Sequence, residues 1–534
     1  MPIRWRSTIA TPGFILPIWA WAASALGGVL STPYPSMVAG EHRAGYGVRP
    51  LFTVGESIRG YRLPGRLDGM AAFELDATTT RIFVSHELQD AEGYSYTTVD
   101  VPALTGARVS FLDVDRRTRA IVDAGLAYRR IRDRQGRRVV DPAQINEDAQ
   151  AMHGFDRFCS AQGYVSGQYR FVDDIFFTCE EASALSGHPH GGSIWALDIR
   201  RAEIWALPRL GRGAWENVAA LDTPNRRYVA MLLGDDRGGA PLYLWVGLKD
   251  GKGTGTFPDR NGLSYGGLYV WRSYTGDLDP DAFNGTGAVR EGEFVPIAVR
   301  DPAQADSLGY DAEGYLDDYT LRDAADSLGA FSFSRPEDLH TNPDLGTQAV
   351  LASTGLGSVY PSDDWGTIYL VDMEMGIGDS LHIEATISIL HDSDDFGDHG
   401  IRSPDNLTWA EDGYIYVQED RSTQIDSFGE ETGIEASVWR LDPVTGDHLR
   451  VAVVDRAVVA PAGSTDADSS TIGAWESSGI IDVSRNFDTA RGELLLLGTV
   501  QAHTVNDSLI GGGGDLVESG QIYFVNRWDR IATE

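Results

Sequence analysis

Short apolar runs, separated by turn residues, fill the chain from about residue 67 onward, and long amphipathic helices are scarce. The clearest unit starts with a strand at 403–409, followed by a turn at 411–413 and a second strand at 414–418. A third strand at 437–442 and a fourth at 449–454 complete it. Four antiparallel strands in so short a segment predict one blade of a β-propeller.

The same pattern recurs along the chain at the spacing expected of blades. The units open near residues 68, 158, 215, 335, 403 and 475. We therefore predict an all-β fold, a β-propeller of about six four-stranded blades with loop insertions, as a single domain over 45–534. The segment 521–525 is expected to pair with a strand near 51–54 and close the ring. The insertions 251–266 and 301–329 are expected to form loops over a face, and a seventh blade would have to lie there.

The N-terminus predicts export. Arg4 and Arg6 precede an apolar stretch at 13–30 that holds small residues and is followed by prolines, as in an export signal over 1–35. An uncleaved N-terminal anchor is the alternative, because the stretch is nearly long enough to span a bilayer. Both place the rest of the chain in the periplasm or outside the cell, with no membrane contact beyond that anchor.

The charge is strongly acidic, with 78 Asp and Glu against 44 Lys and Arg and a net charge of −34. Such a surface repels nucleic acid and anionic lipid, so we exclude both as partners. The acid excess either serves solubility or in part binds cations such as Ca²⁺. The two cysteines, Cys159 and Cys179, predict a disulfide in an exported protein, with a thiolate metal ligand as the alternative.

Two positions in the predicted blades are rich in metal-ligand residue types. Acids at the start of the first strands are Asp68, Glu216, Glu337, Asp405 and Glu476. Acids and histidines after the second strands are His86, Glu87, Glu180, Glu181, Asp235, Asp236, Glu419, Asp420 and His503. Equivalent positions of successive blades converge at one mouth of the channel, so these residues predict an acidic ring. Such a ring repels itself unless cations or protons neutralise it; the alternative is a set of exposed turn acids.

Other motifs are weaker. Residues 392–398 resemble a Ca²⁺ loop without full EF-hand spacing, and a solvated acidic loop is the alternative. We find no serine nucleophile elbow, zinc HExxH motif or dinucleotide fingerprint.

Five short motifs resemble the PhoX-type alkaline phosphatase family. They are Cys159-Ser160-Ala161, Phe177-Thr178-Cys179-Glu180-Glu181, Trp215-Glu216-Asn217, Arg335-Pro336-Glu337 and Ser403-Pro404-Asp405-Asn406-Leu407. Family members are exported β-propellers that hydrolyse phosphate esters with an iron and calcium cluster, in which a cysteine of the Cys-Glu-Glu piece ligates iron. The chain departs from the twin-arginine export signal common in the family, because Trp5 separates Arg4 from Arg6.

The resemblance implies iron and calcium as cofactors, with Mn or Zn as other possible metals. The residues it implies as candidate ligands are Cys179, Glu180 or Glu181, Glu216, Glu337 and Asp405. The ring pattern adds Glu87, Glu419 and His503 as candidate ligands.

We therefore predict an exported, metal-dependent phosphoester hydrolase that acts on a small phosphoester. Arg335 and Arg421 are the candidate phosphate ligands, because a guanidinium donates two hydrogen bonds to an anion; alternatively they pair with neighbouring acids. One rival function is a different propeller hydrolase: either a phosphotriesterase, whose binuclear site His86, His399 and His503 would suit, or a Ca²⁺-dependent lactonase. The other is a non-catalytic, calcium-stabilised extracellular propeller. The sequence leaves the oligomeric state open.

Overall fold

The computed structural model describes residues 32–145, 153–182, 191–377, 381–422, 427–490, 492–507, 509–512 and 515–527. The predicted export signal over 1–35 therefore falls almost wholly outside the described residues. Within them, no helix is both long enough and apolar enough to cross a membrane.

Four sheets are separate antiparallel meanders with the order expected of blades. The first is β3 (Leu67–Asp76), β4 (Thr79–His86), β5 (Arg108–Asp115) and β6 (Ile121–Leu126). The second is β8 (Phe158–Tyr164), β9 (Ile175–Glu180), β10 (Ile194–Asp198) and β11 (Glu203–Ala206), extended by β7 (Arg130–Arg132). The third is β23 (Pro404–Trp409), β24 (Ile415–Glu419), β25 (Ser437–Leu441) and β26 (His448–Val454), extended by β1 (Val38–Gly40). The fourth is β27 (Glu476–Asp482), β28 (Leu494–Ala502), β29 (Ser519–Arg527) and β2 (Tyr46–Thr53).

A nine-stranded sheet contains two further meanders. One is β12 (Trp215–Leu221), β13 (Tyr228–Asp235), β15 (Tyr243–Leu248), β16 (Gly266–Ser273) and β17 (Val289–Ile297). The other is β19 (Pro336–Thr341), β20 (Gln348–Ser353), β21 (Thr367–Ile377) and β22 (Leu381–Asp392). Pairing of β17 with β22 joins the two meanders at their outer edges. A two-stranded sheet of β14 (Ala240–Pro241) and β18 (Ser332–Phe333) lies beside them.

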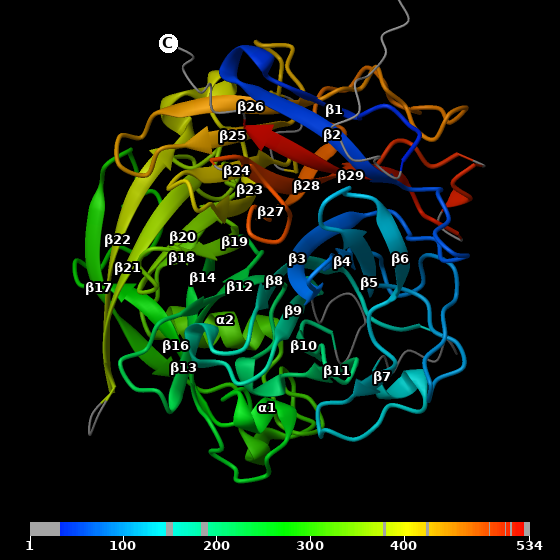
Figure 1. Ribbon diagram of the computed structural model, residues 1–534. Coiled ribbons are helices and arrows are strands. Elements are labelled where there is room, and N and C mark those ends of the chain that lie inside the picture. The colour runs from blue at the N-terminus through cyan, green and yellow to red at the C-terminus, as the bar shows by residue number, and fades with distance from the viewer. Residues whose placement is uncertain are drawn as a thin grey trace, which may run out of the picture.

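The first strands of these units surround a common axis. Each of β3, β8, β12, β19, β23 and β27 contacts the next, and β27 contacts β3 again. Figure 1 looks along this axis. The predicted all-β, propeller-like fold is confirmed, with four separate blades; the count of six is not, because the nine-stranded sheet merges what the sequence predicts as two blades.

Apolar side chains fill the spaces between neighbouring sheets. Between the second sheet and β12–β16, Ile175 and Phe177 pack with Trp215, Trp245 and other fully buried residues. Such face-to-face burial is the main stabilising contribution of the fold. Alternate residues of the strands therefore face apolar cores, which leaves the strand ends free to carry polar groups.

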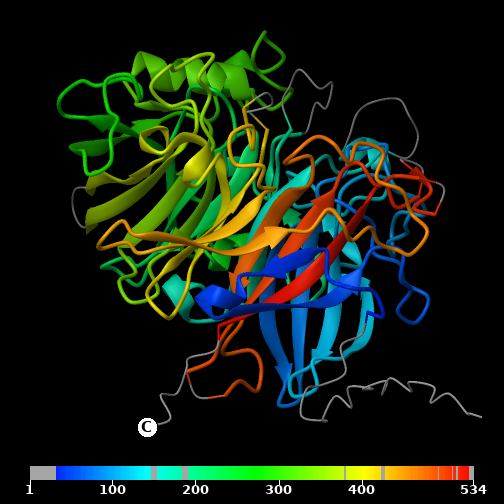
Figure 2. The same cartoon turned by 90° about the horizontal axis from the view of Figure 1, so that it is seen from above.

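The N- and C-terminal strands close the ring as predicted. Thr53 pairs with Gln521 and Phe52 with Ile522, so β2 becomes the outer strand of the sheet that β29 belongs to. Figure 2 shows these two strands side by side. This pairing covers the open edge of β29. Pairing of β1 with β26 extends the sheet-forming part upstream of the predicted boundary at residue 45.

The two predicted insertions carry the helices. Residues 251–266 hold α1 (Phe257–Arg260), and 301–329 hold the 3₁₀ turn η6 (Pro302–Gln304) and α2 (Asp318–Ser327). Arg322 of α2 donates to the carboxylate of Asp235 at 3.0 Å, which fastens this insertion to the end of β13. Other 3₁₀ turns are η1 (His42–Ala44), η2 (Pro142–Gln144), η3 (Gln168–Arg170), η5 (Pro208–Leu210), η7 (Ser393–Asp395) and η8 (Gly397–His399).

Candidate metal centre

A β-bulge recurs at the start of five inner strands. The pairing registers shift between Leu67 and Met70, Phe158 and Ala161, Trp215 and Val218, Pro336 and Leu339, and Pro404 and Leu407. In a bulge two residues oppose one on the partner strand, and the local bend re-aims a side chain. The first bulged residue is in each case a metal-ligand type: Asp68, Cys159, Glu216, Glu337 and Asp405.

A second ring comes from the residue that follows each second strand. These residues are Glu87, Glu181, Asp236, Thr354, Asp420 and His503. Thr354 is the one uncharged, non-ligand residue type in this set, and its Oγ1 donates to the Glu337 carboxylate at 2.6 Å. Equivalent positions of successive blades thus supply two sets of side chains, and several members of both sets lie close together.

The two sets meet in four overlapping groups, within each of which the ligand atoms lie within 4.8 Å of one another. The groups are Asp68–Cys159–Glu216, Glu87–Cys159–Glu181, Glu181–Glu216–Asp236 and Glu216–Glu337–Asp405. Glu216 belongs to three groups and Cys159 to two, so the groups form one continuous cluster.

This donor set fits the metals that the sequence implies. Carboxylate oxygens suit hard cations such as Ca²⁺, and a thiolate adds affinity for iron and other transition metals. The Oδ1 atom of Asp68 is buried and has no hydrogen-bond partner among the described residues. A buried carboxylate oxygen without a donor is costly, and a cation would satisfy it.

The shifted pKa values of the cluster also favour bound cations. Burial, followed by the neighbouring carboxylates, raises the pKa of Glu216 and Asp405 well above the usual range. The pKa of Asp68 rises for the same reasons, and burial raises the pKa of Glu181 to about 8. Burial and the charge of Asp68 raise the pKa of the Cys159 thiol. Without cations these groups retain protons, whereas a bound cation favours the ionised forms.

Two arginines neutralise part of the cluster. Although burial raises the pKa of Asp236, the guanidinium of Arg335, which donates to both of its oxygens at 2.6 Å, holds this pKa below the usual range. Arg335 also lies 3.0 Å from Glu337. Arg157 pairs with Glu87 at 2.7 Å and with Glu181. Burial raises the pKa of Glu87, but Arg157 and then Arg66 outweigh this and hold the pKa below its usual value.

A cavity of about 610 Å³ opens over this cluster. Arg66, Arg157, Arg421 and His503 line it together with Glu87 and Glu476. The Nη1 of Arg421 donates to the carbonyl of Ile472 at 2.9 Å, and Arg421 has no carboxylate partner in the described part of the chain.

His503 adds positive charge at this mouth. Its ring nitrogens lie 3.0 Å from Glu518 and 3.3 Å from Glu476. Burial opposes the charge, but these carboxylates raise its pKa well above the usual value, so both nitrogens carry protons near neutral pH.

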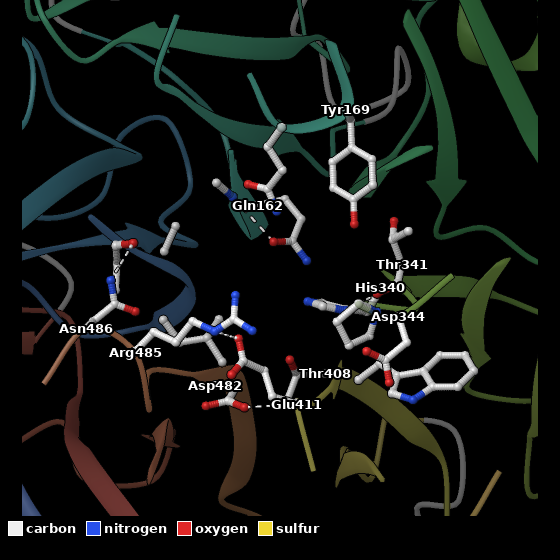
Figure 3. A pocket seen from close by; sticks show the side chains of 17 residues that line it. Gln162, Tyr169, His340, Thr341, Asp344, Thr408, Glu411, Asp482, Arg485 and Asn486 are labelled. Carbon is white, nitrogen blue, oxygen red and sulfur yellow. Dashed lines mark hydrogen bonds and ion pairs between the residues drawn. The ribbon is translucent and has the colours of Figure 1, made fainter. Parts of the chain in front are cut away.

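The other end of the channel has a different character. A cavity there is lined by Gln162, Tyr169 and His340, which Figure 3 shows pointing into it. Its one arginine, Arg485, pairs with Glu411, and further carboxylates lie in the lining. This mouth is therefore poorly suited to a phosphate anion.

The structure gathers most of the predicted site residues. Glu87, Glu181, Glu216, Glu337 and Asp405 all belong to the cluster. His503, Arg335 and Arg421 lie at its mouth but in none of the ligand groups found among the described residues.

Three predicted ligands lie elsewhere. Cys179 is fully buried in the apolar core beside Trp215, and both cysteines are free, so the predicted disulfide is absent. Glu180 accepts from the backbone of Asp156 and Ser193, both at 3.3 Å, and burial raises its pKa to about 8. Glu419 forms a buried ion pair with Arg402 at 2.7 Å.

The sequence pattern did not point to Cys159 as a candidate sulfur ligand, nor to Arg66 and Arg157 as residues of the mouth. The signal was available: Cys159 occupies the same strand position as the four bulged acids. Arg66, Arg157 and Arg335 each precede an inner strand directly. Arg66 and Arg157 have φ of 46° and 45°, a left-handed conformation that is strained for arginine and typical of functional sites.

The other metal candidates have structural roles. The Nε2 of His86 lies 2.7 Å from Ser110, and burial lowers the pKa of this histidine to about 3. His399 is exposed and pairs with Glu431 at 3.1 Å. In the acidic loop 392–398, Asp398 accepts from the backbone of Gly429 at 2.7 Å and pairs with an arginine.

Comparison with known proteins supports the predicted family. Residues 198–438 match the model of a family described as alkaline phosphatase PhoX. Among solved structures, Pseudomonas fluorescens PhoX in complex with vanadate, a transition state analogue, aligns over 94% of this chain and 97% of its own at 16% identity, with a TM-score of 0.60. A polysaccharide lyase, the PL25 ulvan lyase, aligns over 85% of this chain and 94% of its own at 10% identity, with a TM-score of 0.33. No curated protein matches the sequence.

The likeness to the PhoX structure shows a shared fold along almost the whole chain. The family match extends from the end of β10 into β25 and includes Glu216, Glu337 and Asp405 of the cluster. It bears out the predicted metal-dependent phosphoester hydrolase. Residues 198–438 thus match the family described as alkaline phosphatase PhoX, the family that the motifs predict.

Proposed function

We propose that this protein hydrolyses small phosphomonoesters at the mouth above Glu216, with iron and calcium held by the four ligand groups. One observation carries the proposal: a buried cluster of seven carboxylates and one thiol adjoins, through Glu87, a cavity with arginine in its lining. The acids call for cations, and the arginines suit an anionic substrate.

The residues divide the work. Asp68, Glu216 and Glu337 are proposed as oxygen ligands, and Cys159 as the sulfur ligand that favours iron over calcium in its two groups. When bound, such cations polarise phosphoryl oxygens and lower the pKa of water, which supplies a nucleophile.

The positive groups at the mouth receive the substrate. Arg421, which has no carboxylate partner among the described residues, is proposed to donate to the phosphoryl oxygens. Arg335 is engaged by Asp236, Glu337 and Ser422, so its proposed role is to orient two of the ring carboxylates. His503 pairs with Glu518 and Glu476, so its proposed role is to offset part of the negative charge at this mouth.

The remaining functions fit this mouth less well. A phosphotriester or a lactone is neutral and gains little from Arg421. A purely structural calcium site does not need a cavity of about 610 Å³ over its ligands.

Three further points remain proposals. The nine-stranded sheet is proposed to count as two blades, which gives six. The chain from residue 45 is proposed to act as one domain. The protein is proposed to work in the periplasm or outside the cell after export through residues 1–35.

The test compares monoester with triester hydrolysis in the metal-loaded protein. In Arg421→Gln, we expect KM for a phosphomonoester to rise at least tenfold, because a charge-assisted hydrogen bond to the substrate is lost. The exposed Arg226→Gln variant is the matched control and should leave KM unchanged. Preferred turnover of a triester, with no effect of Arg421→Gln on either substrate, would refute the proposal.

A further inference from the structure

A second cavity, of about 360 Å³, lies away from the metal centre. Its walls come from the end of β11 and η5, the loop that holds α1, and the segment after β17. It shares no lining residue with the cavity over the ligand cluster. In Figure 1, α1, β11 and β7 lie together at the lower edge of the molecule.

Positive charge is concentrated there in a chain whose net charge is −34. Arg209, Lys252 and Arg300 line the cavity, and none of them pairs with a carboxylate in the part of the chain that the structure describes. Lys252 is one of only two lysines in the sequence. Partial burial, followed by the charge of Arg209, lowers the pKa of Lys252.

The nearby carboxylates are largely occupied. Asp133 pairs with Arg137 at 2.9 Å, and Asp311 pairs with Arg134. Asp259 accepts from the backbone amides of Lys252 at 2.9 Å, Thr254 at 2.6 Å and Gly255 at 3.2 Å. Glu313 remains as an acid of the lining, and its backbone carbonyl accepts from Arg300 Nε at 2.7 Å. The cavity therefore keeps an excess of positive charge.

Apolar and aromatic groups form the rest of the wall. Trp205 and Tyr315 line the cavity together with Leu207, Pro208, Pro258 and Leu263. The guanidinium of Arg300 lies over the Tyr315 ring at 5.2 Å from its centroid. The indole Nε1 of Trp205 is buried without a hydrogen-bond partner among the described residues. Apolar pockets with a few convergent charges are typical of small-molecule sites.

We propose that this cavity binds an organic anion that joins a phosphate-like group to a planar apolar body. Arg209, Lys252 and Arg300 receive the anionic group, and Trp205 and Tyr315 contact the body. The site is separate from the metal centre and does not depend on the function proposed for it.

Phenylphosphonate is a suitable probe, because its P–C bond is not an ester and is not hydrolysed as one. Binding to the metal-loaded protein is measured by titration calorimetry, and hydrogen exchange locates the bound probe. We expect slower exchange in residues 252–264 and 300–315, and affinity at least tenfold weaker in the Lys252→Gln/Arg300→Gln variant. Lys249→Gln is the matched control: its Nζ donates to the carbonyl of Arg170, outside the cavity, and binding should be unchanged.

The single variant Lys252→Gln gives an independent test, because this side chain is exposed and its loss should not disturb folding. Inorganic phosphate should bind at least tenfold more weakly than the probe at this site, since it lacks the apolar body. Equal affinity in the double variant and in Lys249→Gln, protection confined to the mouth over the metal cluster, or equal binding of inorganic phosphate would each overturn the proposal.

Discussion

Glu419 offers a sharp test of which acids bind metal, because the sequence pattern places it in the ring and the structure gives it another role. Its carboxylate accepts from Arg402 Nη2 at 2.7 Å, from Ser437 N at 2.9 Å and from Trp439 Nε1 at 2.8 Å. The side chains of Glu419 and Arg402 are 0% and 1% exposed. We expect Glu419→Gln to destabilise the fold and to leave the metal content of the folded protein unchanged.

The loss of folding free energy in Glu419→Gln is set by Arg402, the partner that stays buried. In Glu419→Gln the Arg402 guanidinium stays buried with only Asp398, 3.0 Å away, as its counter-charge. Breaking one side of a buried ion pair costs about 3–5 kcal/mol, because the remaining charge stays desolvated. Replacing both partners by apolar residues, as in Arg402→Met/Glu419→Leu, should recover part of this loss for the same reason.

Urea denaturation of metal-free and metal-loaded protein, with metal analysis of the folded fraction, measures both effects. Glu337→Gln is the matched contrast. Burial and then Asp236 already raise the pKa of Glu337, so this substitution removes little charge from the metal-free protein. The metal-free variant should therefore keep its stability, while its metal content falls. Normal stability and reduced metal content in Glu419→Gln would instead make Glu419 a metal ligand.

Two further predictions concern a cysteine pair and a histidine. Cys159→Ala should lose iron, because it removes the thiol shared by two ligand groups, whereas Cys179→Ala should keep iron and lose about 1 kcal/mol of stability through a small core cavity. Metal analysis and denaturation distinguish the two variants. Loss of iron in Cys179→Ala alone would reverse the assignment of the two cysteines. Burial and then His448 lower the pKa of His391 to about 3. As pH falls, this histidine therefore takes up a proton in the unfolded chain before it does so in the folded protein. The stability that the neutral ring contributes is lost as pH falls from about 6.5 towards 3. His391→Phe, whose ring can keep the stacking on Phe396, should weaken this acid dependence in denaturation curves; an unchanged pH dependence would contradict the assignment.

The strand pattern predicted much of the fold. Period-two alternation and turn residues located the third sheet to within a residue or two, and they identified the pairing of β2 with β29. What the pattern could not give is the outer-edge pairing of β17 with β22, because the repeat defines the strands within one unit and not the contacts between the outer strands of two different units. The number of separate blades could not be predicted for the same reason.

The ring was predictable because each blade repeats the same local geometry. Glu216, Glu337 and Asp405 stand at equivalent strand positions, and that registration alone brings them together. Cys179 was misplaced because its family motif was weighed above its register: alternation along β9 turns this side chain into the apolar core. The strand register alone also predicts Glu419 as a ligand, but in the structure Glu419 forms a buried ion pair with Arg402.

Glu216, which belongs to three of the four ligand groups, is the residue whose substitution tests most directly whether the buried ring holds catalytic metal. The direct measurement is metal analysis of purified wild type and Glu216→Gln, with phosphomonoester hydrolysis assayed on the same samples. We expect iron at near-stoichiometric level together with calcium in the wild type, and loss of both metal and activity in the variant. Calcium alone in the wild type, with no ester hydrolysed and an unchanged metal content in Glu216→Gln, would contradict it.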